Sequence, residues 1–139
     1  MPLFGKRSAE PMDERLEQFM PDSKFVRGVI EREQRGILDL ISEDERIVYI
    51  GASEHSSGGV SSDAAVVVTA DRLVIIRKGR IERDVARQRI AKVGMPYDTR
   101  LHKHKCAVIA ENPKDGFIVF IEDRERAATF LSSLGFSPP

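Results

Sequence analysis

The sequence has a single cysteine, no tryptophan and no long apolar run. Because a disulfide needs two cysteines, Cys106 cannot form one within the chain, which suits a reducing compartment. No window approaches the roughly 18 to 20 apolar residues that a membrane-spanning helix needs. The first residues, Met1-Pro-Leu-Phe-Gly-Lys-Arg7, lack an apolar stretch after their charges, so we expect no secretory signal. These absences predict a cytoplasmic protein without a transmembrane segment.

The chain also lacks an excess of charge of either sign, since it has 22 basic and 22 acidic residues. Its 139 residues, 41% of them hydrophobic, are enough for the core of one ordinary domain. The charges are unevenly placed: residues 77–105 hold ten basic and three acidic residues, a net of +7, which leaves −7 for the rest. A basic middle is therefore flanked by acidic ends.

Helical spacing marks the first part of the chain. A short helix is predicted over residues 13–20, and Pro21 ends it. Asp22 or Ser23 can then cap an amphipathic helix over residues 23–41, whose apolar residues recur on one side. We therefore expect an N-terminal tail with a short helix at residues 1–22, followed by one domain at residues 23–135 that includes the leading helix.

Short apolar runs separated by turn residues follow this helix. They predict strands at residues 46–53, 64–69, 72–77, 80–86, 105–110 and 117–121, with a less regular segment at residues 90–96, which makes six or seven strands. The serine- and glycine-rich residues 55–63 predict a flexible loop. A final helix is predicted from Asp123 to a stop at Gly135, with a buried stripe of Ala127, Phe130, Leu131 and Leu134. The order predicts a mainly β, α+β fold that rolls into a barrel or sandwich.

Three segments in this order carry a resemblance to a known family. They are the acidic entry Glu43-Asp-Glu-Arg-Ile-Val-Tyr-Ile50, the hairpin Val68-Thr-Ala-Asp-Arg-Leu-Val-Ile-Ile76 followed by Lys78-Gly-Arg80, and the closing helix from Asp123 to Leu134. Over roughly residues 30–135 the chain resembles the bacterial pleckstrin-homology-like (PH-like) domains. The resemblance implies a strongly bent antiparallel sheet or partly open barrel of about seven strands, capped by a C-terminal α-helix. An added N-terminal helical segment would pack on it or mediate assembly.

The resemblance implies a binding module, but fold alone does not name the ligand. Eukaryotic members of the family bind phosphoinositides through basic residues that flank the loop between the first two strands. The corresponding loop, residues 54–63, has no lysine or arginine, so the sequence does not favour that ligand. In the hairpin, we expect Thr69 and Arg72 to stabilise the turn, with Arg72 lying over the sheet or pairing with a carboxylate.

Two kinds of binding surface are candidates. The leading one is a protein interface, for a partner or a second copy, on the N-terminal helical segment or a sheet edge; its candidate residues, equally suited to the core, are Leu16, Phe19, Met20, Phe25 and Val26. The alternative is an anion-binding surface for phospholipid head groups or nucleic acid, which would place the protein at the membrane periphery when lipid is the ligand. Its candidate residues are Arg83, Arg87, Arg89 and Lys92. Only Tyr97 supplies an aromatic ring between Arg77 and Lys105, fewer than a single-strand binder uses.

Metal binding and catalysis have weaker signals. His102, His104 and Cys106 alternate, so on a strand they would share one side and could in principle bind Zn²⁺ or Cu²⁺. Neighbouring ligands on one flat strand close poorly around a tetrahedral ion, and no fourth ligand is evident. Ser56-Ser-Gly-Gly59 precedes a strand, whereas a phosphate-binding loop precedes a helix. We predict no metal, no cofactor and no enzymatic activity.

Overall fold

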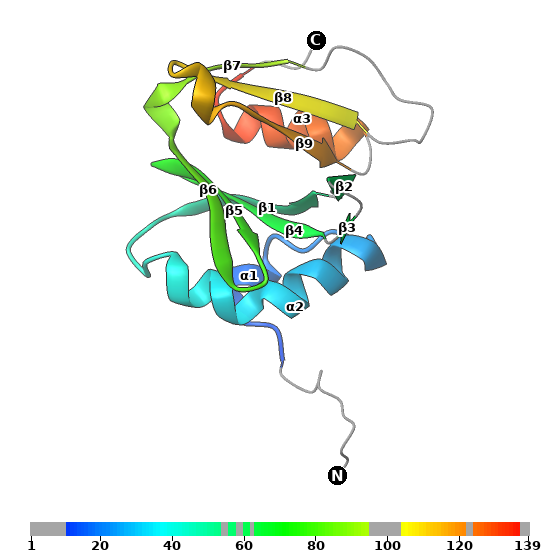
Figure 1. Cartoon of the computed structure of the whole chain (residues 1–139). Helices are drawn as coiled ribbons and strands as arrows, with labels where there is room; N and C mark the ends of the chain where they lie inside the picture. Colours follow the sequence, from blue (N-terminus) through cyan, green and yellow to red (C-terminus); the bar gives the residue numbers. More distant parts are fainter. Residues whose placement is uncertain are drawn as a thin grey trace.

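The computed structural model describes residues 11–53, 56–57, 60–61, 63–94, 104–121 and 124–136. Over these ranges the protein has an α+β fold with a four-stranded and a three-stranded antiparallel sheet, one short strand pair and three α-helices (Figure 1). The predicted mainly β, α+β class is confirmed. The four-stranded and three-stranded sheets are separate, and the described strands form no closed barrel.

The four-stranded sheet has the order β1-β4-β5-β6 and is antiparallel throughout. Its strands are β1 (Ile47–Ser53), β4 (Ala64–Thr69), β5 (Arg72–Arg77) and β6 (Arg80–Ala86). The last three have the predicted bounds. The β5–β6 turn has positive φ at both central residues, 53° at Lys78 and 76° at Gly79, as a type I′ hairpin turn requires.

Residues 56–57 and 60–61 differ from the prediction of a flexible loop over residues 55–63. Two short strands, β2 (Ser56–Ser57) and β3 (Val60–Ser61), pair antiparallel within this stretch. Strands of two residues carry no detectable alternation of apolar and polar positions, so hydrophobic periodicity cannot reveal them.

The three-stranded sheet has the order β7-β8-β9. Its strands are β7 (Ile90–Gly94), β8 (His104–Ala110) and β9 (Phe117–Ile121), with the 3-10 helix η3 (Pro113–Asp115) between the last two. Strand β9 lies beside β1 of the other sheet, where the Phe120 backbone N–H donates to Ser53 Oγ at 3.0 Å. The 3-10 helix η2 (Arg87–Arg89) follows β6 and leads into β7, so it connects the four-stranded sheet to the three-stranded sheet.

The main core lies between the two sheets and helix α3 (Arg124–Ser133). The predicted stripe of α3 is buried in it as expected, since Ala127, Phe130, Leu131 and Leu134 are at most 4% exposed. After the helix, Gly135 adopts a φ of 89°, the left-handed conformation in which helices commonly end.

Helix α2 (Lys24–Leu40) covers the opposite face of the four-stranded sheet, together with the short α1 (Glu14–Glu17) (Figure 1). Ser23 caps α2 by accepting a hydrogen bond from the Val26 N–H. The second core, between these helices and the sheet, includes Val26, Val29, Ile30, Ile37, Ile50, Val67 and Ile76. Because both faces of the sheet are covered, all six residues of β4 are buried. No helix in the described ranges is long and apolar enough to cross a membrane.

A buried carboxylate fixes the tip of the β5–β6 hairpin on α2. Glu33 is 2% exposed, and its two oxygens accept hydrogen bonds from the backbone N–H groups of Lys78 (2.8 Å) and Gly79 (2.9 Å). Close contact requires a small residue on the helix, because a Cβ added to Gly36 would stand 3.1 Å from Gly79 Cα. These hydrogen bonds join α2 to the β5–β6 hairpin, 45 and 46 residues later in the chain.

We expect Glu33→Ala to lower the free energy of unfolding by about 1.5 kcal/mol, because two backbone donors lose their acceptor. Glu33→Gln keeps one acceptor oxygen and should lose less. Urea denaturation measures both, with Glu31→Ala on the exposed side of α2 as the control. Equal stability of the Glu33→Ala and Glu31→Ala variants would contradict the role of this carboxylate.

Candidate functional site

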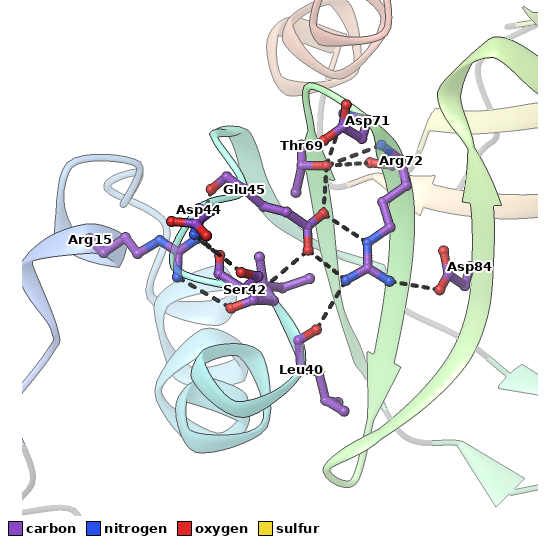
Figure 2. A network of polar contacts seen from close by, with 10 residues as sticks. Arg15, Leu40, Ser42, Asp44, Glu45, Thr69, Asp71, Arg72 and Asp84 are labelled. Carbon is purple, nitrogen blue, oxygen red and sulfur yellow. Dashed lines mark hydrogen bonds and ion pairs between the residues drawn. The ribbon is translucent and has the colours of Figure 1, made fainter.

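A network of polar contacts in the described residues centres on Arg72 (Figure 2). Its guanidinium binds Glu45 in a bidentate manner, with Nε 2.8 Å from Oε2 and Nη2 2.7 Å from Oε1. It also donates to Asp84 Oδ2 at 2.7 Å and to the Leu40 carbonyl at 3.0 Å. One side chain on β5 therefore joins the end of α2, the turn before β1, and β6.

Thr69 completes the hairpin end of this network. Its hydroxyl accepts hydrogen bonds from the backbone N–H groups of Asp71 and Arg72, both at 3.1 Å. The same hydroxyl donates to Glu45 Oε2 at 3.2 Å. The predicted role of Thr69 and Arg72 in stabilising the hairpin is confirmed, and Glu45 is the carboxylate that Arg72 binds.

A second arginine holds the acidic turn from the other side. The Arg15 guanidinium donates to the carbonyls of Ile41, Ser42 and Glu45. The Ser42 N–H donates to Glu45 Oε1, which closes the turn locally. The hydrogen bonds from Arg72 lower the pKa of Glu45, and the same pairing raises the pKa of Arg72. The network connects the chain to itself, so it is a structural element of the fold.

The four basic candidates lie on three different elements. Arg83, on β6, places its guanidinium 5.7 Å from the centroid of the Phe117 ring, a cation–π distance. Arg87, on η2, lies beside Gly135 at the end of α3. Arg89 is exposed at the end of η2, and Lys92 is exposed on β7 opposite Ile109. The described contacts of Arg83 and Arg87 lead to different neighbours, and the anion-binding surface stays a prediction.

The five candidates for a protein interface divide into two groups. Leu16 and Val26 are fully buried in the second core, the alternative that the sequence also allowed for them. Phe19 and Met20 are half-buried against the same core, while Phe25 is 36% exposed. The part of this set available at the surface is therefore Phe19, Met20 and Phe25, which we call the N-terminal apolar surface.

Cys106 lies in the main core and is 0% exposed. Burial raises the pKa of its thiol to about 12, so the reactive thiolate is scarce at neutral pH. Of its two proposed companions, His102 lies outside the described residues, and only the backbone of His104 is described. Within the described ranges, no group of three or more His, Cys, Asp and Glu side chains could hold a metal ion.

Sequence reasoning missed two surface features. Two isoleucines on the three-stranded sheet, Ile109 and Ile118, are 43% and 41% exposed. The signal in the sequence was the unbroken apolar run of residues 117–121, which lacks the polar positions of a strand facing solvent. The second feature is a hollow of about 550 Å³ between residues 11–14 and the second half of α2, with three carboxylates, Asp13, Glu14 and Asp39, in its lining.

No protein-family model, no curated protein and no solved structure matches this chain.

Proposed function

We propose that this chain is a non-catalytic interaction module with a PH-like fold, which binds a protein partner or a second copy of itself. The arrangement of the elements supports this fold. Antiparallel sheets of four and three strands follow each other along the chain, and a C-terminal helix closes the sequence and packs into the core between them. That order agrees with what the resemblance to the PH-like family implies.

The N-terminal apolar surface is the observation that carries the proposed function. Phe25 lies in the first turn of α2, beside the buried Val26, and its ring is left 36% exposed. Phe19 and Met20, half-buried, belong to the segment between α1 and α2. Large apolar side chains of this kind provide the desolvated centre of protein interfaces, where a few residues supply most of the binding energy.

The exposed edge of β6 is a less suitable contact. Residues 80–84 are all exposed, and β6 is an outer strand of its sheet. However, four of these five residues are charged, and the pairing with β5 has a register shift at Ile75/Ile76. Charges and bulges at an edge oppose pairing with another strand. The helical surface is thus favoured over the sheet edge.

We expect Phe25→Glu to reduce capture of a protein partner by about tenfold or more without changing thermal stability. Ile81→Glu is the matched control, since Ile81 is 38% exposed and lies on β6. Removing residues 1–30 is unsuitable as a test, because Leu16, Val26 and Ile30 are fully buried core residues. A chain that neither self-associates nor captures any protein would contradict the proposal, as would capture of a protein partner that Phe25→Glu leaves unchanged.

A second candidate function is anion binding at the basic side chains. Within the described residues, Arg83, Arg87, Arg89 and Lys92 form no ion pair, so their charges are not neutralised by a described carboxylate. The matching ligands are phospholipid head groups or nucleic acid. Binding to DNA, RNA and phosphatidylserine vesicles at low ionic strength tests this function, and failure with all three rejects it.

A further inference from the structure

Strand β9 has the sequence of a strand that is covered on both faces. All five of its residues, Phe117 to Ile121, are apolar. The inward side chains Val119 and Ile121 are at most 1% exposed. On the outer side, Ile118 is 41% exposed and Phe120 is half-buried. A strand with one face in water normally alternates apolar and polar residues, and β9 does not.

Two other strands show which residue types this chain has at buried and at exposed strand positions. Strand β4 is also apolar on both faces, and both are buried, one against α2 and one in the main core. Strand β6 is exposed over residues 80–84, and there four of five residues are charged. Strand β9 is apolar on both faces like β4, yet Ile118 on its outer face is 41% exposed.

The neighbouring strand extends this apolar surface. The pairing of Ala107 with Ile118 places Ile109, two residues along β8, diagonal to Ile118 on the same face. Side chains in this relation are about 7 to 8 Å apart and can contact each other. Ile109, 43% exposed, therefore joins Ile118 and Phe120 in one strip across the sheet, which we call the outer apolar face.

The charges around the outer apolar face indicate what covers it. Lys92 lies opposite Ile109 on β7, Lys105 of β8 is paired with Phe120, and the β8–β9 connection at the end of the sheet exposes Glu111, Lys114 and Asp115. These residues carry charges of both signs, three basic and two acidic. A surface that meets its own copy across a two-fold axis must be complementary to itself, which charges of both signs allow. An anionic membrane or a strongly charged partner would instead match a rim of one sign.

We propose that a second copy of this chain packs on the outer apolar face, sheet against sheet, to form a two-fold dimer. In this packing the isoleucines of each copy cover those of the other, and the charges at the rim pair across the contact. The inference rests on the proposed function as an interaction module. It names the second copy as the partner, on a surface separate from the N-terminal apolar surface.

Sedimentation or light scattering of the full chain over a concentration series tests the proposal. The wild type is expected to change from monomer to dimer with rising concentration. Ile109→Lys with Ile118→Lys is expected to weaken dimerisation by about a hundredfold, since each copy would bury two unpaired cations. Ile81→Lys, at similar exposure on the other sheet, should dimerise like the wild type. If the lysine variant fails to fold, Ile109→Ser with Ile118→Ser replaces it.

Several outcomes would overturn the dimer, and they are distinguishable from failure of the proposed function. A wild type that stays monomeric up to about millimolar concentration, well above the weakest affinity relevant to a specific dimer, refutes it. A dimer that survives both the lysine and serine variants but is lost in Phe25→Glu also refutes it, and leaves the proposed interaction module intact. Loss of the dimer in the lysine variant alone, with Ile81→Lys unaffected, supports it.

Discussion

Replacing Gly51 with alanine is expected to lower the free energy of unfolding by about 3 kcal/mol. A Cβ at this position in β1 would stand 2.3 Å from Tyr49 Oη, 2.8 Å from Cζ and 3.0 Å from Cε2. The ring cannot easily move aside, because Tyr49 is 2% exposed, Phe130 packs on it with centroids 5.5 Å apart, and the Arg126 guanidinium lies 4.8 Å from its centroid. The Tyr49 ring therefore packs directly on the Gly51 backbone and occupies the space that a methyl group would need.

Thermal or urea denaturation measures the effect, and the chain offers a matched control. Gly94, also in a strand, has no atom within 4 Å of an added Cβ, so Gly94→Ala should change stability by less than about 0.5 kcal/mol. Tyr49→Phe removes the nearest clashing atom, so in the Gly51→Ala background it should cost less than it does alone. A Gly51→Ala protein as stable as Gly94→Ala would show that the core accommodates the methyl group.

Arg72→Ala is expected to lower the free energy of unfolding at pH 7 by about 3 kcal/mol, because it leaves the partly buried Glu45 without its partner. Arg72 and Glu45 side chains are 22% and 15% exposed, so solvent screens their pairing only in part. The control is Arg27→Ala, which removes a pair at 3.7 Å whose side chains are 38% and 52% exposed, and it should change stability by less than about 0.5 kcal/mol.

The same variant should change the pH dependence of stability. The pKa of Glu45 in the folded protein is below its ordinary value of 4.5. The pairing therefore stabilises the wild type fully above about pH 4.5, and this contribution is lost as the pH falls through the lowered pKa. The difference in the free energy of unfolding between the wild type and Arg72→Ala should therefore become smaller as the pH falls below about 4.5. A gap of constant size between pH 7 and pH 3, measured by urea denaturation, would show that Glu45 is not the partner responsible.

Much of the local structure followed from short-range patterns. The runs 64–69, 72–77 and 80–86 were bounded by turn residues at both ends, and the structure has strands at these bounds. The stripe of α3 repeats at helical spacing and is buried as predicted. These elements could be predicted because each is an apolar pattern of local spacing bounded by turn or cap residues. The role of Thr69 and Arg72 in the hairpin could be predicted for the same reason, since both residues belong to one local turn.

The candidate binding residues were less predictable because they depend on how the two sheets are placed. Arg83 reaches Phe117, 34 positions further along the chain, and the register shift at Ile75/Ile76 decides where the side chains of β6 point. Leu16 and Val26 have the same apolar character as Phe25, and only the docking of α1 and α2 on the sheet separates the buried from the exposed. No short-range pattern contains that information.

The position of α2 has a consequence for synthesis of the chain. The helix is made first, yet the residues that bury its apolar side come mainly from β1, β4 and β5, and its carboxylate Glu33 binds backbone donors 45 and 46 residues later. Because chains emerge from the ribosome N-terminus first, α2 leaves it before its sheet exists. Until the β5–β6 turn has emerged, the apolar side of α2 lacks the sheet that buries it, and apolar surface exposed in this way favours aggregation.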